Sequence, residues 1–286
     1  MKKKKVISAA LFGDGDKYAQ YVSAFVLGAL NLFPPQDGWV VRLHVDDVVR
    51  RSPRHRVLDG MDRAGLIQLK YMLGEPLLTR AMLWRLAPVF DEGVEYVFSR
   101  DLDAPPMPRD RAACEQFIVS KCALHTVHDN LAHSGVMGGL CGFWAPEFRR
   151  LTGIDSLTEL YKFADRSDEQ WREHGTDQHV LNRISATKIN LTLLEHRFNG
   201  WTEGRPTDYR REASTYGCQD WSCPTPDAGQ WDKVGSYDCG SLRLRADQLG
   251  NHLGCAGYDH LAARHFWETH GNEEYARALR ACEVEG

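Results

Sequence analysis

The segment "YVFSRDLDAPPMPR", residues 96–109, begins as an apolar strand and then places two carboxylates, Asp101 and Asp103, on either side of a leucine. Prolines follow, and proline has no backbone N–H and a fixed φ, so the chain leaves regular structure there. Because alternate side chains of an extended chain point the same way, both acids face one side. The segment therefore predicts the end of a strand with two carboxylates available to one cation.

Strands and helices alternate on the N-terminal side of this segment. Apolar runs at 5–13 and 40–46 predict strands, and periodic segments at 17–33 and 77–90 predict helices, the second ending near Pro88. Residues 61–73 indicate a weaker helix and strand pair. This alternation predicts an α/β fold with a mostly parallel sheet and helices on both faces. In such sheets ligands bind beyond the carboxyl ends of the strands, where Asp101 and Asp103 would lie.

The remaining sequence divides at about residue 200. Residues 109–120 predict a helix, 125–144 a loop that passes into a glycine-rich segment, and 168–184 a region that includes a helix. Beyond Gly200 the sequence is rich in Gly, Pro, Asp and aromatic residues and has no period. We expect a core of residues 1–200 and a loop-rich extension, 201–286, that packs on it and has a last helix from Tyr258 onward.

Composition excludes several classes of protein. The chain has 286 residues, 43% of them hydrophobic, and a formal net charge of -4, so no overall positive field favours nucleic acid or an anionic membrane. The apolar run after Lys2–Lys5 is too short for a membrane span or a secretory signal, and a cytoplasmic location is expected. The eight cysteines are then expected as free thiols. A zinc site is the alternative for four of them, although their spacing lacks paired C-x-x-C motifs: Cys218, Cys223, Cys239 and Cys255.

Three segments resemble one superfamily of enzymes. "AMLWRLAPVFDEGVEYVFSRDLD", residues 81–103, resembles the helix, strand and D-x-D motif of glycosyltransferases with the GT-A fold. "TDQHVLN", residues 176–182, is similar to the D-Q-x-x-L-N segment of the retaining family that includes glycogenin and bacterial lipopolysaccharide galactosyltransferases. Residues 6–21 resemble the nucleotide-facing first strand and loop. The resemblance covers roughly residues 5–185 and implies metal-dependent transfer of a sugar from a nucleotide diphosphate sugar to an acceptor hydroxyl, with retention.

The resemblance implies a metal site. Asp101 and Asp103 would hold Mn²⁺ or Mg²⁺, which prefer oxygen ligands, and Asp101 would also touch the ribose. The ion and nearby arginines would neutralise the charge that grows on the leaving diphosphate. The family takes its third ligand from an H-x-x-G segment, and His252 in "NHLGCAGY" is assigned to it although the spacing differs. His196 is the alternative.

The resemblance also implies which residues bind and act on the donor. Asp177 would accept hydrogen bonds from sugar hydroxyls, and the amide oxygen of Gln178 would stabilise an oxocarbenium-like centre. Arg85 and Arg100 would bind the sugar or its phosphates, since arginine suits bidentate contacts. Uracil is the commonest base in the family, so a UDP-sugar is the expected donor. The other expected donor-binding residues are Ser8, Leu11 and Phe12 at the base and ribose, Asp129 at a sugar hydroxyl, and Gly138 and Gly139, where the backbone can approach the sugar closely.

Alternative interpretations stay open at this point. An inverting transferase would use Asp177 or Asp129 as a general base. A protein of the same fold could bind a sugar or nucleotide without turnover. More simply, Asp101 and Asp103 suit a solvated turn and Asp177 suits a helix cap. The acceptor is expected to be a saccharide, with a lipid-linked glycan, a protein or a modified nucleobase as alternatives; nucleic acid itself and a membrane span are not expected.

Overall fold

The computed structural model describes residues 3–13, 16–72, 79–104, 106, 108–128, 135–173, 175–188, 190–197, 236–239, 242–245, 264–265, 267–269 and 271–285.

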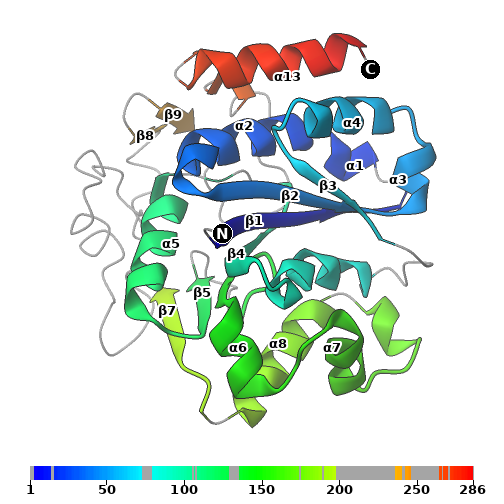
Figure 1. Cartoon of the computed structure of the whole chain (residues 1–286), viewed down its shortest axis with the longest axis vertical. Coiled ribbons are helices and arrows are strands. Elements are labelled where there is room, and N and C mark those ends of the chain that lie inside the picture. Colours follow the sequence, from blue (N-terminus) through cyan, green and yellow to red (C-terminus); the bar gives the residue numbers. More distant parts are fainter. Residues whose placement is uncertain are drawn as a thin grey trace.

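A seven-stranded sheet forms the centre of the described chain, in the order β3-β2-β1-β4-β6-β5-β7 (Figure 1). β1 pairs in parallel with β2 and β4, β2 with β3, and β5 with β7. Within this sheet, β6 runs antiparallel to both of its neighbours, β4 and β5. The predicted α/β fold with a mostly parallel sheet is therefore confirmed. The strands are β1 Lys4–Leu11, β2 Trp39–Val45, β3 Gln68–Tyr71, β4 Val94–Arg100, β5 Leu124–His128, β6 Leu140–Trp144 and β7 Leu193–Arg197.

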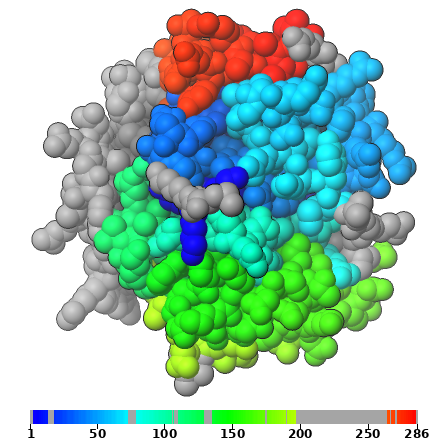
Figure 2. All heavy atoms as spheres, in the orientation of Figure 1, coloured from blue at the N-terminus to red at the C-terminus, as the bar shows by residue number. Residues whose placement is uncertain are grey.

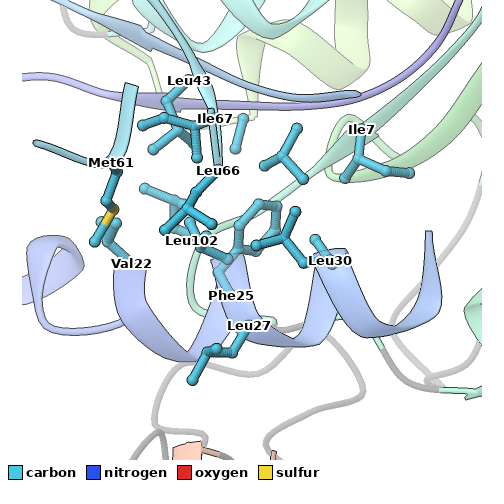
Figure 3. Close-up of a cluster of buried hydrophobic side chains, with 14 of the residues drawn as sticks. Ile7, Val22, Phe25, Leu27, Leu30, Leu43, Met61, Leu66, Ile67 and Leu102 are labelled. Atoms are coloured by element: carbon cyan, nitrogen blue, oxygen red, sulfur yellow. The ribbon is translucent and has the colours of Figure 1, made fainter. Parts of the chain in front are cut away.

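Helices on one face of the sheet build the larger core cluster. α2 (Val22–Leu32) and α4 (His55–Arg63) pack against the side chains of Ile7 in β1 and Leu43 in β2 (Figure 3). Phe25 and Leu27 of α2 have 0% of their surface exposed. Full burial of one such side chain contributes about 1.5–3 kcal/mol, so this cluster anchors the N-terminal half of the sheet. Helix α5 (Pro108–Ser120) adds Phe117 to the same cluster.

The other face carries the second core cluster. A 3₁₀ helix, η2 (Ala81–Phe90), lies against Val6 of β1 and Val97 of β4. Three further helices complete this layer in Figure 1: α6 Ala145–Thr152, α7 Leu157–Ala164 and α8 Thr176–Thr187. Because consecutive side chains of a strand point to opposite faces, Val6 and Ile7 serve different clusters. The layer of η2 and α8 is the one that builds the site described below.

Several predicted elements differ from those observed. The helix expected at 17–33 is divided into α1 (Asp16–Ala19) and α2, with Gln20 and Tyr21 between them. The helix expected at 77–90 is the 3₁₀ helix η2 and continues through Pro88, which has no N–H for an i→i−4 bond. Between β2 and β3, where no helix was predicted before residue 61, the chain forms α3 (Asp47–Arg51) and then α4.

Residues 125–144 were expected as a loop, yet most of β5 and all of β6 lie within this range. All five residues of β5 are buried, and its sequence, LHTVH, does not alternate between polar and apolar residues. Strands buried on both faces lack the two-residue period by which a strand is recognised. The histidines and glycines of this range therefore suggested a loop where the sheet in fact continues.

The described C-terminal residues include a final helix, α13 (Glu273–Glu285), and a hairpin of β8 (Ser236–Cys239) and β9 (Leu242–Arg245). α13 belongs to the larger core cluster through Ala276, Leu279 and Cys282. In Figure 2 its orange and red atoms lie directly against the blue N-terminal segment. Within the described ranges, no helix is long and apolar enough to cross a membrane.

Candidate functional site

Three charged side chains from distant segments meet at the carboxyl end of β4. Arg85 of η2 donates from Nη1 to the carboxylate of Asp101, the residue that follows β4. Its Nη2 donates to the carboxylate of Asp177 in the first turn of α8. One guanidinium thus holds two carboxylates, one 16 and the other 92 positions further along the chain. We call Arg85, Asp101 and Asp177 the charged cluster.

The charged cluster is buried on one side and open on the other. The side chains of Arg85 and Asp177 are each 7% exposed, whereas that of Asp101 is 47% exposed. Burial disfavours the charged guanidinium, but the carboxylates of Asp101 and Asp177 outweigh it and raise the pKa of Arg85 above its usual value. Arg85 therefore stays charged beneath the exposed carboxylate of Asp101.

Two glycines before β6 close over the charged cluster. A Cβ on Gly138 would overlap the carboxylate of Asp177, and one on Gly139 would overlap that of Asp101. The hydroxyl of Ser99 donates to the carbonyl of Gly138 at 2.7 Å, which binds this stretch to β4. Backbone can approach the carboxylates this closely only because both positions lack a side chain.

The turn after β4 presents the two acids of the D-x-D motif as the sequence predicts. Leu102 is 3% exposed and belongs to the larger core cluster (Figure 3), while Asp101 and Asp103 on either side are partly exposed. The amide of Ala104 donates to the carbonyl of Asp101 at 3.2 Å and closes the turn. Two partly exposed carboxylates at a sheet edge are a donor set that suits a hard divalent ion such as Mg²⁺ or Mn²⁺.

The segment 176–182 forms the start of α8. Gly175 occupies the N-cap position and Asp177 uses its carboxylate on Arg85, so Asp177 is not the helix cap. The amide nitrogen of Gln178, which is partly buried, lies 3.8 Å from Sδ of Met137. Both residues expected to act on the donor sugar, Asp177 and Gln178, therefore lie beside residues 137–138.

Arg100 does not take the predicted donor-binding position. Its side chain is 1% exposed, and its Nη1 donates to the carbonyls of Ser99 at 2.8 Å and Cys141 at 3.1 Å. Along β4 the side chains alternate, so Arg100 points to the face opposite Ser99 and into the interior. This burial contradicts a role in binding the donor; Arg100 instead supports the junction of β4 and β6.

The expected base-binding residues of the first strand also separate into two groups. Ser8 is 0% exposed in the middle of β1, and Leu11 is 3% exposed within the larger core cluster. Both side chains are thus closed off from solvent, and a role for them at the base and ribose stays a prediction. Phe12, just beyond the strand, is partly exposed and packs edge-on against Trp84, with ring centroids 5.9 Å apart. Phe12 is therefore the residue of this set that lies beside η2.

His196, the alternative third metal ligand, is a core residue. It is 1% exposed, with Nδ1 2.7 Å from Nε2 of His125, and its Nε2 contacts the side-chain oxygen of Gln116. Burial lowers the pKa of His196 to about 4. The burial of the ring and the contacts of both its nitrogens with His125 and Gln116 contradict a role as a metal ligand at the exposed edge of the sheet.

Several predicted site residues lie outside the described residues: Asp129, His252, Cys218, Cys223 and Cys255. Cys239 lies in β8. Among the residues that the structure does describe, no three His, Cys, Asp or Glu side chains gather in a way that could hold a metal ion.

The buried histidines make stability depend on pH. The pKa of His44 is lowered to about 3 by burial and by Arg42 and Lys70, and that of His196 to about 4, from 6.5 in each case. Between pH 6.5 and 4 the unfolded chain binds protons at these histidines and the folded chain does not. Their contribution to the free energy of unfolding is therefore fully present above pH 6.5 and is lost as the pH falls.

His196→Gln should reduce this loss. When the free energy of unfolding is measured with urea at pH 7 and at pH 5, its decrease should be smaller than in the wild type by up to about 1.4 kcal/mol per pH unit. His179→Gln, exposed on α8, should keep the wild-type loss; an unchanged loss in His196→Gln would contradict the assignment.

Two residues that the sequence analysis did not single out fix loops through backbone amides. Asp46 accepts from the amide of Gly13 at 2.8 Å and from that of Val49 at 2.9 Å, which joins the loop after β1 to the start of α3. Asn182 accepts from the amide of Val136 at 2.8 Å. An acid at the end of a predicted strand is a signal for Asp46, whereas the partner of Asn182 lies 46 positions earlier and has no local signal.

The described residues define an α/β protein whose sheet carries an arginine and two carboxylates beyond the carboxyl end of β4, a central strand. No family model matches the sequence. A search of curated proteins finds no match either.

Proposed function

We propose that the protein is a metal-dependent glycosyltransferase that moves a sugar from a nucleotide diphosphate sugar to an acceptor hydroxyl. The observation that carries the proposal is the convergence of Arg85, Asp101 and Asp177 at one place. Asp101 belongs to the D-x-D motif and Asp177 to the D-Q-x-x-L-N segment, so two motifs that resemble GT-A glycosyltransferases meet in the fold. They meet at the carboxyl edge of the sheet, where ligands bind in proteins of this architecture.

In this proposal the exposed side of the charged cluster receives the donor's diphosphate. Asp101 and Asp103 would hold Mn²⁺ or Mg²⁺, which would neutralise charge on the leaving group. Arg85 lies directly behind Asp101 and would add a fixed positive charge. Phe12, beside η2, would line the nucleoside end, and a UDP-sugar is the proposed donor.

The sugar would lie between residues 137–139, which lead into β6, and the start of α8. Asp177 is held in place by Arg85 and would accept from sugar hydroxyls. With its amide nitrogen toward Met137, Gln178 would offer its amide oxygen to the positive charge that develops at the anomeric carbon. The acceptor hydroxyl would then attack on the side of the leaving group, which retains the configuration.

The inverting alternative would need a carboxylate free to take the acceptor's proton. Asp177 is 7% exposed and its carboxylate is bound to Arg85, which favours a binding role over that of a general base. A saccharide acceptor and a cytoplasmic location stay predictions.

A donor screen tests the proposal. The purified chain should hydrolyse one nucleotide sugar slowly in the presence of Mn²⁺ or Mg²⁺, and chelation with EDTA should stop it. Asp103→Ala should lower this rate by at least about 100-fold, because it removes a proposed ligand of the ion that stabilises the leaving group. Asp168→Ala, an exposed aspartate on the surface, is the matched control and should keep the wild-type rate.

Three outcomes would overturn the proposal. One is that no nucleotide sugar is turned over and none stabilises the protein against heat, which would leave neither transfer nor donor binding. A second is stabilisation without turnover, which would favour the non-catalytic binding protein. The third is an unchanged rate in Asp103→Ala. The anomeric configuration of the product, read by NMR, separates retention from inversion.

A further inference from the structure

Residues 135–139, which we call the glycine loop, are held by side chains from three different elements. Ser99 of β4 donates to the carbonyl of Gly138 at 2.7 Å. Thr126 of β5 accepts from the amide of Met137 at 3.0 Å, and Asn182 of α8 accepts from the amide of Val136 at 2.8 Å. Three successive loop residues thus have three separate anchors, and the position of the loop is strongly determined.

Asn182 differs from the other two anchors because it belongs to the helix that carries the site. Ser99 and Thr126 are strand residues with 0% exposure and attach the loop to the sheet. Asn182 instead connects the loop to α8, whose first turn holds Asp177 and Gln178. Its Nδ2 also donates to the carbonyl of Gln178 at 2.8 Å. One amide therefore joins the loop and the first turn of α8.

The fit between Asn182 and the loop leaves no spare room. Gly135 has a φ of +65°, and a Cβ there would overlap the side-chain amide of Asn182. At the other end of the loop, a Cβ on Gly138 would overlap the carboxylate of Asp177. The loop thus touches α8 side chains at both ends, and these contacts need a fixed separation between loop and helix.

We propose, on the basis of the proposed function, that Asn182 is a positioning residue that sets the separation between the glycine loop and α8. In this way it holds Asp177 and Gln178 in place for the donor sugar without touching the donor. Both functions of the amide are needed, since Oδ1 accepts from the loop while Nδ2 donates to the helix. A displacement of about 1 Å in such a site can cost about 100-fold in rate.

The proposal predicts a specific kinetic change in Asn182→Ala. Its kcat for donor hydrolysis should fall about 10- to 100-fold, because the sugar-facing residues are displaced. The dissociation constant for UDP with Mn²⁺, measured by calorimetry, should change less than about 3-fold, because Asp101 and Asp103 lie on a separate segment. Asn182→Asp should recover part of the rate, since it keeps the acceptor for Val136 and loses the donor for Gln178.

Thr187→Ala is the matched control on the same helix. Its exposed hydroxyl donates to the carbonyl of Arg183 at 2.8 Å, so this variant loses a helix-surface hydrogen bond with no contact to the loop. It should keep the wild-type kcat. Equal losses in Thr187→Ala and Asn182→Ala, or a wild-type kcat in Asn182→Ala, would overturn the proposal.

Hydrogen exchange separates this proposal from the proposed function. In Asn182→Ala, mass spectrometry should show faster amide exchange in the peptide that contains residues 135–139, while peptides from β1 and β2 stay unchanged. A wild-type protein that consumes no nucleotide sugar would refute the proposed function and with it the role of Asn182 in turnover. Unchanged exchange in the glycine loop would refute Asn182 as its anchor, whatever the activity.

Discussion

Replacing Arg85 by methionine should lower the free energy of unfolding by about 3–5 kcal/mol, because it leaves the carboxylate of Asp177 buried without its ion-pair partner. The side chain of Asp177 is 7% exposed, so water cannot take the place of the guanidinium. Urea unfolding at pH 7 measures the effect. The same variant should lose donor hydrolysis, since the positive charge behind Asp101 is gone.

The second carboxylate on the same guanidinium provides the control. Asp101 is 47% exposed, so Asp101→Asn should cost less than about 1 kcal/mol of stability. The double variant Arg85→Met with Asp177→Leu removes both buried charges and should recover much of the loss, since such replacements are often nearly neutral. If Arg85→Met costs no more than Asp101→Asn, the pair with Asp177 does not stabilise the fold.

Gly138→Ala should reduce donor hydrolysis by more than about 100-fold, because the new Cβ would overlap the carboxylate of Asp177 and force either the loop or that carboxylate to move. Stability should fall by about 1–3 kcal/mol, the usual effect of overpacking a closed site. Steady-state rates with the donor from the screen, together with urea unfolding, measure both changes.

Two other glycines separate this effect from the general cost of a methyl group. Gly93 is exposed, and a Cβ at this position would meet no neighbouring atom within 4 Å, so Gly93→Ala should leave both rate and stability unchanged. Gly139→Ala would meet the carboxylate of Asp101, which is partly exposed and can turn toward solvent. It should therefore cost less stability than Gly138→Ala. Wild-type rate and stability in Gly138→Ala would contradict the close approach.

The local patterns predicted the elements that have a clear period and failed where packing removes it. The acids around Leu102 follow the alternation of an extended chain, with Leu102 in the core and both acids partly exposed. β5 has all five residues buried and no alternation, so the strand was missed. The same local rule could not tell which face of a strand meets the site, and the side chain of Arg100 is buried on the face opposite Ser99.

By itself the sequence determined the alternation of strands and helices, the turn at Asp101 and Asp103, and the residue types able to bind an anion or a hard cation. These features depend on neighbours along the chain, so they can be read from local periods. Only the tertiary structure decided that Arg85 pairs with Asp177, 92 positions away, and that Asn182 reaches Val136. The first contact arises because η2 and α8 pack on the same face of one sheet, and the second because α8 lies against the loop before β6. Such packing between distant elements leaves no trace in local spacing.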